Sequence, residues 1–210
     1  MVKGLFMKKV LLTAVLTVFV GCSKQPNTET NNEKMTQPVV AQPAADEKTD
    51  TEKGAEQLLS KNTLPEAIEM IKPTMSDEFN AFPAAAGVVA FWMENKHTKI
   101  SDIKNIPTST RGKILKDSFN ERGKRLCVSG TIVEIQVDRS GGFPAYHAGL
   151  ASNYTDFTRV LAVGSTGELV ANSSATFCGV VIGKIGFNNA VGGTTNAPYL
   201  VGMFDLPENK

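Results

Sequence analysis

The spacing of apolar residues changes after Gly123, and this change constrains the fold more than any other feature of the sequence. In VEIQV, residues 133–137, apolar and polar residues alternate, which is typical of a strand with one buried face. The predicted strand is RLCVSGTIVEIQV (125–137), and Gly130 interrupts it at a point where a bulge would let the strand coil. Four further strands are predicted in AYHAGLAS (145–152), FTRVLAVG (157–164), ATFCGVVIGKI (175–185) and YLVGMFDL (199–206). Five short strands with glycine-marked bends predict a small closed barrel.

Residues 57–122 have helical spacing in short pieces. In LPEAIEMI the apolar residues share one helical face, Thr63 is suited to the N-cap, and Pro65 is acceptable in the first turn. Pro73 is expected to end this helix. The predicted fold class is therefore α+β, with short N-terminal helices followed by a small five-stranded barrel in residues 123–207.

A second helix is expected to begin near Ser76, to break or restart at Pro83, and to continue through AAAGVVAFWMEN to about Asn95. It is apolar nearly all round, which favours a buried core helix over an exposed helix that binds a partner. TKISDIKNIP predicts one more short helix, and STRGKILKDSFNERGK predicts one of about three turns that Gly123 closes.

Two strand motifs resemble those of a known fold. VSGTIVEI in the first strand and CGVVIGK in the fourth are similar to motifs of the OB-fold, in particular of the tRNA-anticodon-like OB group found in bacterial exported proteins of uncharacterised role. The resemblance covers about residues 124–206 and implies a five-stranded OB-like β-barrel. The helix that usually joins the third and fourth strands is missing or very short here, so a partly open sandwich remains the alternative.

The N-terminus has the layout of a secretory signal peptide, with three early lysines before an apolar run at residues 10–20. That run is too short for a transmembrane helix, which needs roughly 20 residues. Gly21 and Cys22 resemble the lipobox of bacterial lipoproteins, which implies that residues 1–21 are removed and that Cys22 carries the lipid. Ser23 then implies anchoring in the outer membrane, facing the periplasm. A plain signal peptide that leaves Cys22 free is the alternative.

Residues 22–56 are rich in Asn, Thr, Gln, Pro and Glu, and they contain few large apolar side chains. Such a segment buries too little surface to offset the entropy of ordering its backbone. We therefore predict a disordered tether that holds the folded part away from the membrane.

Lipidation of Cys22 would leave two cysteines, Cys127 and Cys178. In an exported protein such a pair predicts a disulfide, with two reduced buried thiols as the alternative. A zinc site is less favoured, because His97 and His147 are the only histidines and neither has ligand spacing from a cysteine.

The sequence contains no motif for catalysis, for a cofactor or for a metal. No Ser has the spacing of a GxSxG elbow, and GVVIGKI lacks the spacing of a phosphate-binding loop. Removal of a leader with three lysines and no acid leaves 19 basic and 21 acidic residues, a net charge of −2. A chain with this balance has no bulk field that would attract nucleic acid. We therefore expect no enzyme and no cofactor.

The OB resemblance implies a binding surface on strands two and three and on the loops DRSGGFP and GFNNAVGGTTNAP. Aromatic and amide side chains in these places suit sugar rings or an extended peptide. The candidate ligand-binding residues are Arg139, Phe143, Tyr146, His147, Tyr154, Phe187, Asn188, Asn189, Thr194 and Asn196. The alternative is that the loop glycines and asparagines only meet turn geometry.

Two functions follow as expectations. The first is a non-catalytic envelope lipoprotein, a membrane-tethered binding or scaffold module for a periplasmic protein, peptide or glycan. The second is a protein that binds single-stranded nucleic acid, which fold ancestry favours and the charge balance disfavours.

Overall fold

The structure is a computed structural model in which residues 49–153, 156–189 and 191–207 are described. Cys22, the expected signal peptide and Tyr154 lie outside the described residues. Within the described ranges, no helix has the length and apolar character that crossing a membrane requires.

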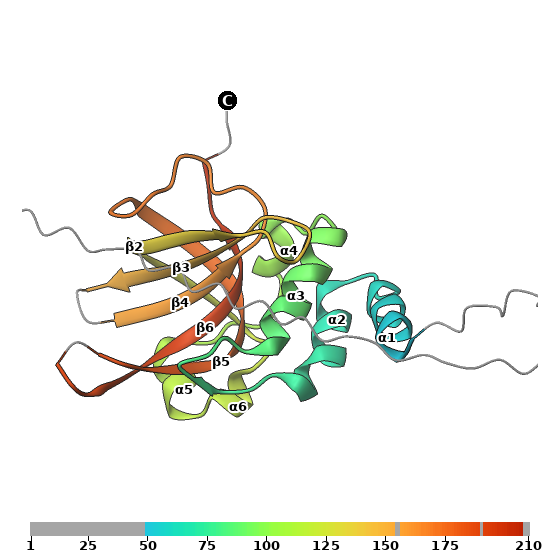
Figure 1. The fold of residues 1–210 in the computed structure, drawn as a ribbon, viewed down its shortest axis with the longest axis horizontal. Helices are drawn as coiled ribbons and strands as arrows, with labels where there is room; N and C mark the ends of the chain where they lie inside the picture. The colour runs from blue at the N-terminus through green and yellow to red at the C-terminus, as the bar shows by residue number, and fades with distance from the viewer. Residues whose placement is uncertain (1–48, 154–155, 190, 208–210) are drawn as a thin grey trace, which may run out of the picture. The chain divides into compact units, whose positions relative to one another are not determined.

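In the described part of the chain, six short helices precede the main strands (Figure 1). They are α1 (Asp50–Leu59), α2 (Leu64–Ile71), α3 (Ala84–Asn95), α4 (Ile100–Lys104), α5 (Arg111–Lys116) and α6 (Ser118–Glu121), with a 3-10 turn η1 (Lys72–Thr74) after α2. The predicted cap of α2 is confirmed, because the Thr63 side chain accepts a hydrogen bond from the Glu66 N–H and Pro65 lies in the first turn.

Three helix boundaries differ from the expectation. Helix α1 begins at Asp50, behind a capping box of Thr49 and Glu52, so the last part of the expected tether is helical. No helix begins near Ser76; residues 78 and 79 instead form a short strand. The expected three-turn helix is divided into α5 and α6 at Asp117, whose non-helical backbone ends one helix and whose carboxylate caps the next.

The strands form one mixed sheet. They are β1 (Glu78–Phe79), β2 (Arg125–Asp138), β3 (Ala145–Ser152), β4 (Asp156–Ala162), β5 (Ser174–Asn188) and β6 (Thr194–Phe204). The order is β1-β5-β2-β3-β4-β6, and β6 pairs again with β5, so five strands form a ring. Strands β4 and β6 are parallel, as are β1 and β5, and the other pairs are antiparallel. The α+β class is therefore confirmed.

Two details of the strands correct the sequence expectation. The register shift in β2 lies between Ile132 and Glu134, beyond Gly130. The segment 186–198, expected as a loop, is mostly the end of a hairpin, because β5 extends to Asn188 and β6 begins at Thr194. Polar and small residues predominate in this segment, so no hydrophobic alternation predicts that its two halves pair as strands.

Two apolar clusters lie on the two faces of the ring strands. Along β5, Phe177 and Val181 belong to one cluster, made mostly of strand residues, and Val180 and Ile182 belong to the other. The second cluster includes six of the twelve residues of α3 and side chains from α1, α2 and α4. The expectation of α3 as a core helix is confirmed, since Trp92 and Met93 are buried. Below, the outer face means the face of the strands that carries this helical cluster.

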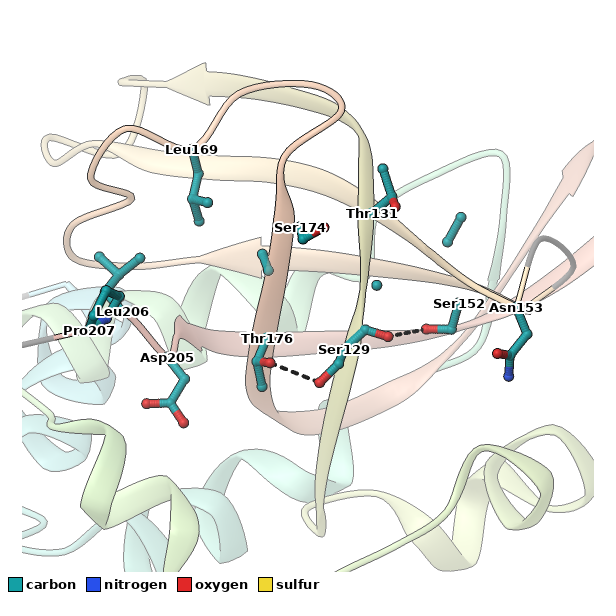
Figure 2. A pocket seen from close by; sticks show the side chains of 13 residues that line it. Ser129, Thr131, Ser152, Asn153, Leu169, Ser174, Thr176, Asp205, Leu206 and Pro207 are labelled. Atoms are coloured by element: carbon teal, nitrogen blue, oxygen red, sulfur yellow. Dashed lines mark hydrogen bonds between the residues drawn. The ribbon is translucent and has the colours of Figure 1, made fainter.

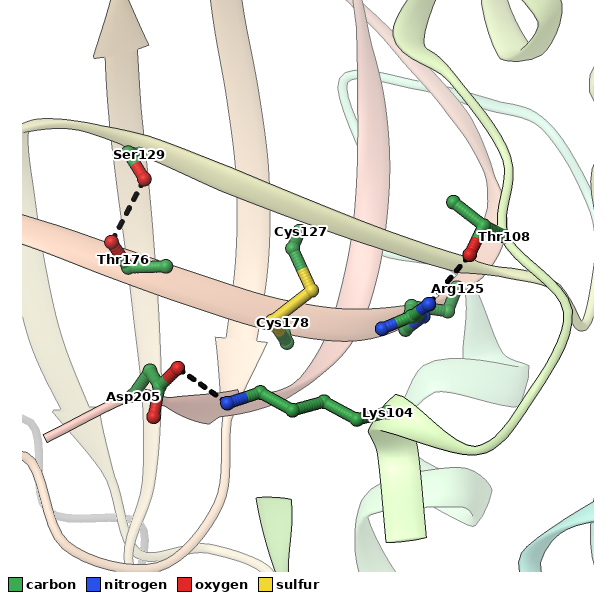
Figure 3. Close-up of a disulfide and its surroundings, with 8 residues drawn as sticks. All are labelled: Lys104, Thr108, Arg125, Cys127, Ser129, Thr176, Cys178 and Asp205. Carbon is green, nitrogen blue, oxygen red and sulfur yellow. Dashed lines mark hydrogen bonds and ion pairs between the residues drawn. A yellow bond between two sulfur atoms is a disulfide. The ribbon is translucent and has the colours of Figure 1, made fainter. Parts of the chain in front are cut away.

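The disulfide between Cys127 and Cys178 is confirmed. The two residues are direct partners in the β2–β5 ladder, and the bridge joins these neighbouring strands beside the Ser129–Thr176 hydrogen bond (Figure 3). Lys104 of α4 forms an ion pair with Asp205, just beyond β6, at 2.7 Å. A covalent bond thus joins β2 to β5, and an ion pair joins α4 to the residue that follows β6.

The ring closes where Gly179 of β5 pairs with Gly202 of β6. A Cβ on Gly202 would overlap the carbonyl oxygen of Cys178, and a Cβ on Gly179 would lie 2.8 Å from the carbonyl oxygen of Val201. The two backbones can approach this closely only without side chains.

Substitution Gly202→Ala tests this crossing. We expect the free energy of unfolding to fall by about 2–3 kcal/mol, because the added methyl group meets backbone that cannot move aside. Urea denaturation followed by circular dichroism measures it. Gly112→Ala is the control, because nothing lies within 4 Å of a Cβ at Gly112 in α5 and alanine favours a helix. Equal stability of the Gly202→Ala variant and the wild type would refute the argument.

Replacement of both Cys127 and Cys178 by alanine tests the disulfide. The cysteines are 51 residues apart, so the chain-entropy model gives a loss of about 4 kcal/mol. The thermal midpoint of the double variant should fall accordingly. A midpoint unchanged by both the substitutions and a reductant would mean that the bridge does not form in solution.

Candidate functional site

A cavity of about 440 Å³ lies between the start of α3 and the outer face of β3, β4 and β6. We call it the aromatic cleft. It is lined by Phe82, Pro83, Ala84, Ala86, Gly87, Ala90, Phe91, Asp138, Ser140, Gly141, Phe143, Ala145, His147, Leu161 and Tyr199. Its volume and its mainly apolar wall with a few polar groups are those of a small-ligand site.

Phe82 covers the polar side chains in the wall of the cleft. Its ring stacks on His147, with ring centroids 4.4 Å apart and planes at 28°, and it lies 5.8 Å from the ring of Tyr199. Phe82 is 53% exposed, so its other face is open to solvent. The exposed ring of Phe82 thus lies over a half-buried histidine ring and beside a buried tyrosine ring.

The rim of the cleft carries one carboxylate, Asp138. It accepts a hydrogen bond from the Ser140 N–H at 2.8 Å, and its Oδ2 lies 3.6 Å from Nε2 of His147. The bonds from Ser140, backbone first, lower the pKa of Asp138, and His147 lowers it further. Asp138 is therefore ionised at neutral pH and can accept hydrogen bonds from a ligand.

The hydroxyl of Tyr199 is buried and has no hydrogen-bond partner among the described residues. The residue is 1% exposed, and its pKa is raised well above the ordinary value by burial, with Arg159 opposing the shift. Nδ1 of His147 is likewise buried and has no partner. Unsatisfied buried polar atoms are costly and call for an explanation.

Arg159 lies next to Tyr199 in the β4–β6 register. Its guanidinium forms an ion pair with Glu134 and lies over the rings of Phe157 and Phe187, at 5.0 and 5.4 Å from their centroids. Gly149, between Glu134 and Arg159 in the sheet, has no side chain to obstruct this contact. Burial lowers the pKa of Arg159. This charge is thus already engaged within the protein.

The residues predicted from the sequence are not gathered into one site. Phe143 and His147 line the aromatic cleft, whereas Phe187 packs against Phe157 and Arg159. Tyr146 packs against the other face of the strands, in the cluster without helices α1–α4. Arg139 is exposed beyond the end of β2.

The amide residues of the β5–β6 hairpin support its structure. Oδ1 of Asn189 accepts hydrogen bonds from the N–H groups of Val191 and Gly193, and its Nδ2 donates to Thr195. Asn188, Thr194 and Asn196 are exposed along the hairpin strands. Asn189 thus has the role in turn geometry that the alternative describes.

Phe82, Phe91 and Tyr199 were missed by the sequence reading. Each belongs to a segment read only as helix or strand, and the cleft arises from packing α3 on the sheet. The only sequence signal is Phe82 directly before Pro83 at the start of an apolar helix.

A second pocket, of about 610 Å³, includes five Ser and Thr residues among the thirteen that line it (Figure 2). Ser129 and Thr176 share a hydrogen bond at 2.8 Å, and the Ser152 hydroxyl donates to the Ser129 carbonyl at 2.6 Å. None of the residues lining it, all within the described ranges, has a buried polar atom without a partner. Its polar groups are thus accounted for by the fold itself or by solvent.

The segment that carries Phe82 is fixed by Asp77. Oδ1 of Asp77 accepts hydrogen bonds from the Lys184 N–H and Arg122, and Oδ2 accepts one from Ser118 at 2.6 Å. A Cβ on Gly183 would overlap the Ser76 carbonyl oxygen, so glycine allows this segment to pass close over β5. Burial pushes the pKa of Asp77 up, but these hydrogen bonds together lower it below the ordinary 3.8.

Comparisons with known proteins assign no role to these sites. No protein-family model matches the chain, and no curated protein matches it significantly. In the described part of the chain, no group of three or more His, Cys, Asp or Glu side chains could hold a metal ion. The interpretation of the cleft therefore depends on its own geometry.

Substitution Asp77→Asn tests the anchor of the Phe82 segment. At pH 7 we expect a loss of about 1–3 kcal/mol, because charge-assisted hydrogen bonds to Ser118, Lys184 and Arg122 are weakened. Since the folded-state pKa is depressed, the wild-type advantage is complete above the ordinary pKa and is lost as pH falls below about 4. Thermal unfolding of both proteins from pH 7 to pH 3 measures this difference. Glu168→Gln, at an exposed position, is the control; a pH-independent difference would contradict the account.

Proposed function

We propose that this protein is a non-catalytic binding module, tethered to the bacterial envelope, whose aromatic cleft holds an uncharged glycan. The observation that carries the proposal is the composition of the cleft. Exposed and half-buried aromatic rings adjoin one carboxylate and one serine, and neither lysine nor arginine is among the described residues that line it.

The side chains suit a sugar better than a charged ligand. The C–H faces of a sugar ring pack on aromatic faces such as those of Phe82 and Phe143, which supplies contact area. Asp138 and Ser140 at the rim can bind its hydroxyl groups. A cleft of about 440 Å³ has room for one or two sugar rings.

The same composition disfavours single-stranded nucleic acid. Affinity for nucleic acid comes mainly from cations that neutralise phosphates, and no lysine or arginine is among the lining residues in the described part of the chain. The nearby Arg159 is already paired with Glu134. Helix α3 also packs against β4 and β6, which leaves less of the outer face open for an extended strand of bases.

The ring of strands supports the proposal of an OB-like barrel. The first strand of the ring, β2, pairs with β3 and β5, and the third, β4, pairs in parallel with the fifth, β6, which is the connectivity expected for that fold. On this assignment β3 and β4 are its second and third strands. His147 and Leu161 would then place the cleft on the face that such barrels use for ligands.

The membrane anchor is proposed from the sequence alone. Residues 1–21 would be removed, Cys22 would carry the lipid, and the protein would face the periplasm from the outer membrane. Two or three acyl chains suffice for stable anchoring. A tether of about 30 residues, if flexible, would let the cleft sample a radius on the order of 30 Å from its anchor.

Titration of the soluble form, residues 23–210, with oligosaccharides tests the proposal. We expect calorimetry to detect binding of at least one uncharged trisaccharide among N,N′,N″-triacetylchitotriose, cellotriose and maltotriose, with affinity that is insensitive to salt. Phe82→Ala should weaken it by about tenfold through the loss of stacking area. Phe119→Ala is the matched control, because Phe119 is 71% exposed on α6, outside the cleft.

The nucleic-acid alternative predicts the opposite result. Absence of binding to every sugar, together with binding of a labelled oligo(dT) that weakens steeply between 50 and 200 mM salt, would replace this function with the nucleic-acid alternative.

A further inference from the structure

We infer that the aromatic cleft recognises the acetamido group of an N-acetylated amino sugar, through Tyr199 and His147 beneath a displaceable Phe82. This inference rests on the proposed function and names its ligand class.

Two residues that line the cleft each carry a buried polar atom with no hydrogen-bond partner among the described residues. Tyr199 and His147 both line it, and Phe82 contacts both of their rings. The Tyr199 hydroxyl and Nδ1 of His147 are buried without a hydrogen bond. Leaving a buried polar group unpaired costs stability in the unliganded fold, and a ligand that pairs it recovers that cost on binding.

The hydrogen-bonding capacities of the two atoms define the ligand. Nε2 of His147 faces the Asp138 carboxylate at 3.6 Å, which favours the proton on Nε2 and leaves Nδ1 as an acceptor. The phenol of Tyr199 is a good donor, and its raised pKa keeps it protonated. The ligand must therefore offer an N–H or O–H donor close to an acceptor oxygen.

An acetamido group combines that donor and acceptor with an apolar end. Its N–H would donate to Nδ1 of His147, its carbonyl oxygen would accept from Tyr199, and its methyl group would contact the apolar lining at Ala145 and Leu161. The amide is uncharged, which agrees with a cleft that lacks a free cation.

The side chain of Phe82 can change its rotamer while the neighbouring backbone stays folded. Its side chain is half exposed, and the backbone on either side is fixed by the Asn80 N–H bond to the Gly186 carbonyl at 2.8 Å and by Pro83 at the start of α3. A change of side-chain rotamer would uncover the two polar atoms and bring the ring against the face of the bound sugar. Phe82 thus shields the site when it is empty and stacks on the ligand when it is filled.

Calorimetry with the soluble form, residues 23–210, and three matched trisaccharides tests the inference. Triacetylchitotriose should bind at least about tenfold more tightly than cellotriose, which has hydroxyls in place of the acetamido groups, and than the de-N-acetylated chitotriose. Tyr199→Phe should weaken binding of triacetylchitotriose by at least about fivefold and leave binding of cellotriose unchanged.

The thermal midpoint distinguishes a ligand-binding role of the Tyr199 hydroxyl from a structural one. Because the Tyr199 hydroxyl has no partner in the fold, Tyr199→Phe should leave the thermal midpoint unchanged or raise it. Tyr146→Phe is the control, since Tyr146 faces the other side of the strands and should alter neither binding nor selectivity.

The outcomes distinguish the two proposals. If no trisaccharide binds, the proposed function fails. If triacetylchitotriose and cellotriose bind equally and Tyr199→Phe binds as the wild type does, glycan binding stands and the acetamido inference is overturned. A lowered midpoint of Tyr199→Phe with unchanged selectivity would also overturn it, because the hydroxyl would then serve the fold.

Discussion

The close approach of β5 and β6 at Gly179 and Gly202 underlies the rest of the structure. Because no side chain separates the two backbones there, β6 can pair with β5 and with β4 and complete the ring. That closure sets β4 and β6 in parallel and brings Tyr199 beside Arg159. A third glycine, Gly183, admits the segment anchored by Asp77. The positions of these glycines thus determine where β5 approaches β6 and where the segment around Asp77 crosses β5.

The cleft follows from these constraints and from α3. Because α3 is apolar on most sides, it packs on the outer face of the sheet and buries Trp92 and Met93. Its first turn stands apart from β3, and Phe82 and Phe143 line the space between them. The helical region and the ring both contribute residues to the lining of the cleft. Tyr199, a strand residue, and Phe82, a residue before a helix, thus line the same cleft.

Sequence reasoning succeeded where local patterns suffice. Alternation located β2, Thr63 and Pro65 located α2, and the paired cysteines predicted the disulfide. It failed where contacts between segments distant in the sequence determine the structure. Phe187 and the hairpin amides were assigned to a loop because their strand pairing is not evident from hydrophobic alternation. The cleft could not be found, because the docking of α3 depends on side-chain packing between segments far apart in the sequence.

The most direct test of the account is where a bound sugar lies. Amide chemical shifts of ¹⁵N-labelled protein, residues 23–210, would be recorded during titration with triacetylchitotriose. The account predicts that the largest changes fall in residues 80–91 and 138–147 and at Tyr199. Changes centred instead on the hydroxyl-lined pocket around Ser129 and Thr176, or on the β5–β6 hairpin, would contradict it.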